Sequence, residues 1–149
     1  MELDKVNSLV ELFFEKYKEK KESSHQPFLK WLKNNDDNFL TWDQVRNDIF
    51  FFSNYLSKCL SKGDRCVLLS ENRPEWLIAD IAIMNAGGVT VPLFTTYSEK
   101  DYEYIINDCK PTVCIISNNV QYNKIKKYIT NETKVISFEN FDQKIESIK

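Results

Sequence analysis

Apolar residues recur at helical spacing over the first twenty residues of the chain, with lysines and glutamates between them. This spacing gives a helix one apolar side and one charged side, which predicts an N-terminal amphipathic helix. The apolar side consists of Val6, Val10, Phe13, Phe14 and Tyr17. Residues 18–26 are polar and are expected to form a linker, so we assign residues 1–26 to this helix and its linker.

Two short apolar runs follow the linker, and a polar turn separates them. The runs are residues 28–32 and 39–40, and every residue from 34 to 38 is Asn or Asp. These two residue types favour turns because their side chains bond to the nearby backbone and tolerate left-handed conformations. The pattern predicts a β-hairpin.

A capping signature begins the next predicted helix. Thr41 stands at the N-cap and Gln44 at the third helical position, which is the arrangement of a capping box. Gly63 is expected to end this helix as a left-handed residue. The apolar face of the helix is predicted to carry Val45, Ile49, Phe52, Leu56 and Leu60.

From residue 66 onward, short apolar runs alternate with helical segments. Pro74 is typical of a first helical turn, and Pro111 ends a helical segment. Strands are predicted at residues 66–69, 89–93, 113–116 and 134–138, with helices at 74–84, 99–108 and 119–128. Such alternation with short connections predicts a parallel sheet covered by helices.

The predicted fold class is therefore α/β, with a parallel sheet and flanking helices preceded by an N-terminal helix and a β-hairpin. On the pattern alone the sheet is flavodoxin-like or Rossmann-like. We expect residues 27–149 to form this α/β subdomain and to be incomplete at the C-terminus.

Charge and glycine content argue against two kinds of ligand site. The chain has 20 basic and 22 acidic residues, and 17 of the basic ones are lysine, so it lacks the basic excess of a nucleic-acid-binding protein. It has only three glycines, Gly63, Gly87 and Gly88. These three positions fit neither of the glycine-rich phosphate-binding motifs, G-x-x-x-x-G-K-S/T and G-x-G-x-x-G. A glycine-loop nucleotide site is therefore excluded in this chain.

The cysteines and the apolar segments indicate a compartment. Cys59, Cys66, Cys109 and Cys114 lack the spacing of a zinc site, and the single histidine, His25, is distant in sequence. Buried thiols in a reducing cytoplasm fit better than disulfides. The charged N-terminus does not resemble a signal peptide, and the uncharged segment 81–98 is broken by Gly and Pro, so we expect a cytoplasmic chain with no transmembrane segment.

Arg73 is the main candidate for a ligand contact. It lies between a predicted strand and a predicted helix N-terminus, where open α/β sheets bind anions. The alternative, which we prefer, is a local ion pair with Glu71 or Glu75. Other polar side chains could also contact a ligand but are better explained by turns, caps or pairs within the fold, or solvent-facing helix surfaces: Asp80, Thr95, Thr96, Tyr97, Lys124, Lys126 and Lys127.

Residues 41–111 resemble the N-terminal part of long-chain acyl-CoA synthetases, members of the adenylate-forming superfamily. Three segments carry the resemblance: Gly-Asp-Arg at 63–65, Ser-Glu-Asn-Arg-Pro-Glu-Trp at 70–76 and Ala-Gly-Gly-Val-Thr-Val-Pro-Leu at 86–93. Tyr-Ile-Ile-Asn-Asp at 104–108 completes it. Two departures are Phe94, where tyrosine is common, and Cys109, where serine is more usual.

The resemblance implies a parent enzyme that makes an acyl-adenylate from ATP and passes the acyl group to coenzyme A. The phosphate loop of such enzymes, of the type S-G-T-T-G-x-P-K-G, does not occur in these residues, nor does their Y-G-x-T-E motif. We therefore expect an N-terminal fragment that is inactive alone, with no catalytic, cofactor-binding or metal-binding residues of its own. ATP, Mg²⁺ and CoA would bind to the parent enzyme.

The expected partner is the remainder of the synthetase or another synthetase chain. Two other functions stay open at this point. One is a non-catalytic partner of a full-length synthetase, and the other is a flavodoxin-like module that binds a small molecule.

Overall fold

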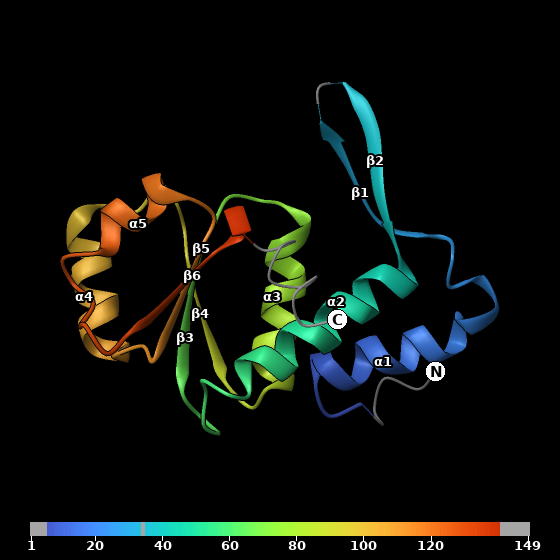
Figure 1. Cartoon of the computed structure of the whole chain (residues 1–149), viewed down its shortest axis with the longest axis horizontal. Coiled ribbons are helices and arrows are strands. Elements are labelled where there is room, and N and C mark those ends of the chain that lie inside the picture. The colour runs from blue at the N-terminus through green and yellow to red at the C-terminus, as the bar shows by residue number, and fades with distance from the viewer. Residues whose placement is uncertain (1–5, 34, 141–149) are drawn as a thin grey trace.

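A computed structural model describes residues 6–33 and 35–140, which form an N-terminal helical segment, a projecting hairpin and a helix-covered sheet (Figure 1). Within these ranges, no helix is both long enough and apolar enough to cross a membrane. The elements before the main sheet are α1 (Leu9–Glu19), the 3₁₀ turn η2 (Lys21–Ser23), β1 (Pro27–Lys33), β2 (Asp36–Thr41) and α2 (Trp42–Leu56).

The N-terminal helix α1 begins at Leu9, because the side chain of Ser8 caps it by accepting a hydrogen bond from the Glu11 amide at 3.1 Å. Val6, predicted on the apolar side of the helix, therefore lies before it. Phe13 is buried and joins Phe28 of the hairpin and Trp42 of α2 in an aromatic cluster. The predicted linker at 18–26 is also partly helical, since it contains the end of α1 and η2.

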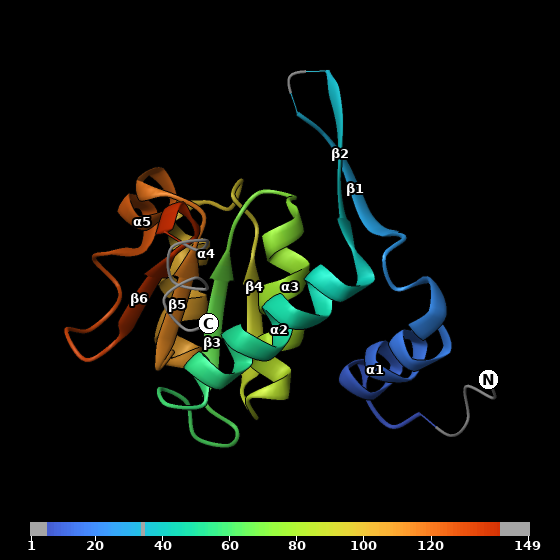
Figure 2. The same ribbon diagram turned by 45° about the vertical axis from the view of Figure 1, so that its right-hand side comes forward.

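The hairpin is confirmed, with a shorter turn than the sequence suggests. Strand β2 begins at Asp36, which pairs with Lys33, so three of the five Asn and Asp residues at 34–38 lie in the strand. Asn35 has a φ of 65°, the left-handed conformation that a tight turn requires. Figure 2 shows the two strands extending away from the rest of the molecule.

The capping box of α2 is present, but the helix ends earlier than predicted. The Gln44 amide donates to Thr41 Oγ1 at 3.2 Å, and the Thr41 amide donates to Gln44 Oε1 at 2.8 Å. The helix ends at Leu56, and soon after it the amides of Lys58 and Cys59 bond three residues back instead of four. Gly63 is therefore not its C-terminal residue. It lies in a later turn with a φ of +85° and donates its amide to the Gly87 carbonyl at 2.8 Å.

The main sheet contains four parallel strands in the order β4-β3-β5-β6. Their bounds are β3 (Arg65–Leu69), β4 (Val89–Leu93), β5 (Val113–Ile116) and β6 (Lys134–Ser137). Counted from β3 along the chain, this is the order 2-1-3-4 of a flavodoxin-like doubly wound sheet. The predicted α/β fold class is confirmed.

Helices cover both faces of this sheet (Figure 1). Cys66 and Leu68 pack with α2 and α3, whereas Val67 and Leu69 pack with α4 and α5. The remaining elements are α3 (Pro74–Asn85), α4 (Glu99–Cys109), α5 (Asn119–Ile125) and the 3₁₀ turn η3 (Phe138–Asn140). The predicted end of α5 near Tyr128 is too late, and the last strand ends one residue before Phe138.

Candidate functional site

The carboxyl ends of β3 and β5 are the place where this topology favours a ligand. The chain leaves β3 towards α3 on one face of the sheet and leaves β5 towards α5 on the other. The loops diverge there, and open α/β sheets bind ligands in such a crevice. Ser70 and Ser117 follow the two strands directly and are both buried.

A hydrogen bond between the loop after β3 and the first turn of α5 spans this crevice. The side chain of Gln121, from the first turn of α5, donates through Nε2 to Oε1 of Glu71 at 2.6 Å. Gln121 is buried, and its amide donates to the side chain of the N-cap residue Asn118 at 3.1 Å. The contact joins residues that are fifty positions apart in the sequence.

Glu71 carries its negative charge at the edge of this crevice. Burial alone would raise the pKa of its carboxyl group, but the polar side chains of Ser117, Gln121 and Asn118 and its own backbone amide favour the charged form. Together they hold the pKa of Glu71 below its usual value. A phosphate group placed in the crevice would meet a like charge, which disfavours nucleotide binding there.

Arg73 forms the ion pair that the sequence suggested, with Glu75 as its partner. Its Nε donates to Glu75 Oε2 at 2.8 Å and its Nη2 to Oε1 at 2.9 Å, so the contact is bidentate. The guanidinium carbon also lies 5.4 Å from the centre of the Phe138 ring. Burial would raise the pKa of Glu75, but the hydrogen bond from Arg73, its own backbone amide and the charges of Arg73 and Lys33 together lower that pKa.

A cavity of about 550 Å³ separates this loop from the hairpin. Trp31 and Lys33 line it from β1, and Glu71, Arg73 and Glu75 line it from the loop after β3. Three of its charged groups are held by contacts within the protein, since Arg73 and Glu75 bind each other and Glu71 binds Gln121. The cavity therefore offers polar walls without a concentrated charge of one sign.

Two of the three lysines predicted to face solvent in and just after α5 bind other elements, although Lys127 is exposed as predicted. Lys124 donates to the Thr95 carbonyl oxygen at 2.7 Å, and Lys127 forms an ion pair with Glu99. Lys126 is exposed as predicted. These contacts attach α5 to the loop before α4 and to its first turn.

The other candidate side chains lie apart from the crevice. Tyr97 packs edge-on against Phe94 and against Tyr102 of α4, and its amide donates to the Phe94 carbonyl oxygen, which confirms the turn predicted before α4. Asp80 lines an apolar cavity between α1 and α3, and His25 is exposed. Thr96 is also exposed, after the end of β4.

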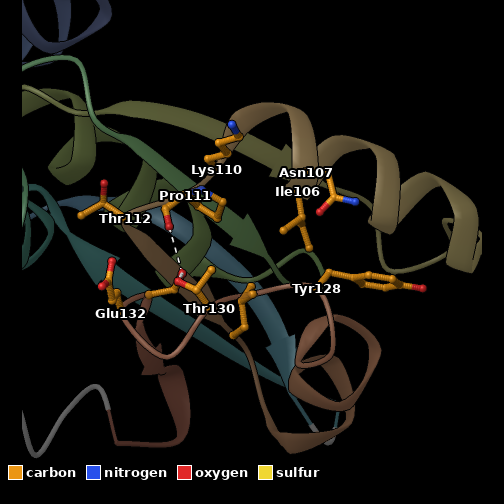
Figure 3. Close-up of a pocket in the computed structure, with 10 residues that line it drawn as sticks. Ile106, Asn107, Lys110, Pro111, Thr112, Tyr128, Thr130 and Glu132 are labelled. Atoms are coloured by element: carbon orange, nitrogen blue, oxygen red, sulfur yellow. Dashed lines mark hydrogen bonds between the residues drawn. The ribbon is translucent and has the colours of Figure 1, made fainter.

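A second cavity, of about 440 Å³, opens at the other end of the sheet (Figure 3). Lys110 and Pro111 line it at the entry to β5, and Thr130 and Glu132 line it from the loop before β6. The Thr133 hydroxyl donates to the Pro111 carbonyl at 3.1 Å and holds that loop in place. This is the amino end of the strands, opposite the edge at which α/β sheets bind ligands.

The polar side chains of this site bond to other groups of the protein, and the carboxylate of Glu71 remains partly exposed. In the part of the chain that the structure describes, no three His, Cys, Asp or Glu side chains are grouped to hold a metal ion. Gln121 is the residue that the sequence analysis missed. The sequence indicates only that the segment after β5 is polar. It does not show that Gln121 binds Glu71, because that contact depends on β3 and β5 being neighbours in the sheet.

Comparison with known proteins identifies the family. The profile of the family described as AMP-binding enzyme matches residues 16–148. The human mitochondrial acyl-coenzyme A synthetase ACSM3 is 38% identical over 71 residues, which cover 46% of this chain and 12% of that protein. The long-chain-fatty-acid–CoA ligase ACSBG2 of Gallus gallus is 33% identical over 67 residues, covering 45% of this chain and 9% of its own length.

Solved structures share the fold. The crystal structure of VinN superposes with a TM-score of 0.77 at 16% identity, covering 95% of this chain and 34% of that one. This chain thus spans about a tenth of the length of the curated relatives and about a third of the solved chain. Since the family match extends over most of the sequence, the chain belongs to the AMP-binding enzyme family.

Proposed function

We propose that this chain forms the N-terminal part of the large domain of an ATP-dependent long-chain fatty acid–CoA ligase. Such an enzyme joins a fatty acid to AMP and then transfers the acyl group to coenzyme A. The observation that carries the proposal is the family match over residues 16–148, combined with 33–38% identity to two acyl-CoA-forming enzymes. The four free thiols suit a reducing cytoplasm, where we place the protein.

We propose further that the 149 residues alone do not form the adenylate. Attack of a carboxylate on the α-phosphate builds negative charge on phosphoryl oxygens, and catalysis depends on positioned donors and Mg²⁺. At the crevice, Glu71 has the wrong charge for this purpose, and the guanidinium of Arg73 is engaged by Glu75. ATP, Mg²⁺ and CoA would then bind to parts of the enzyme outside these residues.

The remainder of the enzyme is the proposed partner of this scaffold. Two apolar side chains are exposed at the carboxyl edge of the sheet. Phe94, directly after β4, is 67% exposed, and Val120, in the first turn of α5, is 64% exposed. On the hairpin, Leu32 and Phe39 are 73% and 53% exposed on the same face. Large apolar side chains exposed together mark surfaces that another part of a protein covers.

Expression of the complete reading frame that contains this sequence tests the activity. We expect palmitoyl-CoA and AMP to form from palmitate, ATP and CoA, with a lower kcat/KM for acetate. The matched control is the 149-residue chain under the same conditions, which is expected to give no product above a blank without protein. Adenylation of amino acids and not of fatty acids by the complete protein would contradict the proposal.

A further inference from the structure

A thiol and an amine from distant parts of the chain meet on the face of the sheet that α2 covers. Lys134 Nζ, at the start of β6, lies 3.0 Å from Cys59 Sγ, in the turn after α2. The Cys59 thiol donates to the Tyr55 carbonyl oxygen at 3.6 Å, which leaves the sulfur lone pairs towards the amine. The same amine lies 4.8 Å from the centre of the Tyr55 ring.

Partial exposure sets Cys59 apart from Cys66 and Cys114. Cys66 and Cys114 are fully buried on opposite faces of the sheet. Burial raises the pKa of the Cys66 thiol far above its usual value and that of Cys114 to about 12. Cys59 is partly exposed, and its neighbour Lys134 is exposed, so this pair of residues borders solvent that carries peroxide.

Cys109 is a natural control for the contribution of the amine. It is partly exposed like Cys59, and burial raises the pKa of its thiol. The cation beside it is Arg65, which donates to the Cys109 carbonyl oxygen at 2.7 Å. A guanidinium keeps its proton under all ordinary conditions and is not a nucleophile, whereas a lysine amine becomes one when its proton leaves.

We propose that Cys59 and Lys134 form a peroxide-dependent covalent cross-link between the end of α2 and β6. In the first step the sulfur of Cys59 attacks hydrogen peroxide. An S–O bond forms, the O–O bond breaks, and sulfur loses two electrons to give a sulfenic acid and water. In the second step the uncharged amine of Lys134 attacks that sulfur, an S–N bond forms, and a second water leaves with the sulfenic oxygen.

The amine of Lys134 must lose its proton before the second step. The contact with the Cys59 thiol, followed by that with Tyr55, raises the pKa of Lys134. Conversion of the thiol to a sulfenic acid replaces the first of these contacts, and the attack proceeds through the uncharged fraction of Lys134, which grows as the pH rises. The product connects positions 75 residues apart, so it attaches the edge strand β6 to the helix packed on it.

Peptide mapping of the full 149-residue chain, with and without hydrogen peroxide, tests the cross-link. We expect one new species that joins the Cys59 and Lys134 peptides and is about 2 Da lighter than their sum, because two hydrogens are lost. Dithiothreitol should release it. Lys134→Arg keeps a positive hydrogen-bond donor and should abolish the species, while Cys109→Ser should leave its yield unchanged.

Circular dichroism of each variant confirms that the loss does not come from misfolding, and Lys134→Gln provides a second variant without a nucleophilic amine. Oxidation of Cys59 in the wild type only to sulfinic or sulfonic acid would overturn the proposal. Persistence of the lighter species in a folded Lys134→Arg chain would overturn it as well. A linked product heavier by one oxygen would overturn the direct S–N bond.

Discussion

Leu68 and Val67 are neighbours on β3 whose side chains enter opposite faces of the sheet, and both are 0% exposed. Leu68 packs with α2 and α3, and Val67 packs with α4 and α5. Truncation of each to alanine therefore measures how well the helices cover each face. We expect a large loss of unfolding free energy for each variant, because helices bury the apolar cluster on both faces.

The magnitudes follow from the atoms removed. Leu68→Ala deletes three carbons, worth about 2.4 kcal/mol at about 0.8 kcal/mol for each buried methylene. The cavity left behind raises the loss of unfolding free energy to about 3–4 kcal/mol. Val67→Ala deletes two carbons and is expected to cost about 2–3 kcal/mol on the same reasoning. For a chain of this size, Leu68→Ala should lower Tm by roughly 6–16 °C.

Urea unfolding followed by circular dichroism measures these losses, and an unchanged m-value keeps the comparison valid. Leu68→Met preserves volume and should cost less than about 1.5 kcal/mol. Val120→Ala, at a position 64% exposed, should change stability by no more than about 0.5 kcal/mol. If Val67→Ala cost no more than Val120→Ala, the reasoning that α4 and α5 close the second face would be refuted.

Three further predictions concern caps, turns and charges. Thr41→Ala removes the capping box and should lower the unfolding free energy by about 1 kcal/mol, whereas Thr41→Ser should retain most of it in the same urea assay. Gly87→Ala should cost about 1 kcal/mol or more because Gly87 has a φ of +87°; an unchanged urea midpoint would contradict this. The lowered pKa of Glu75 stabilises the fold above the unfolded value of about 4.3, and this contribution is lost as the pH falls through the lower folded value. Glu75→Gln should therefore lose less stability than the wild type between about pH 6 and about pH 3, as measured by urea unfolding at each pH.

Local signals in the sequence predicted most of the elements. The Thr41 and Gln44 cap and the apolar runs at β3 to β6 depend on neighbours a few residues away, and the structure confirms them. Helix ends were predicted less well. Leu60 is buried as expected but lies beyond α2, because an apolar position can reach the core from a turn as well as from a helix.

The candidate site depends on contacts that periodicity cannot reveal. Glu71 and Gln121 meet only because β3 and β5 are adjacent in the sheet, and the strand order is not written in either segment. The same holds for Lys124 and Lys127, whose partners lie in the loop before α4 and in the first turn of α4. Arg73 was an exception, since its partner Glu75 is two residues away.

We propose that the groups that bind ATP lie outside these residues. Isothermal titration of the purified 149-residue chain with ATP and Mg²⁺ tests it most directly. The account predicts no saturable heat up to roughly 1 mM ATP. Magnesium-dependent binding with a Kd of about 10 µM or tighter would contradict it.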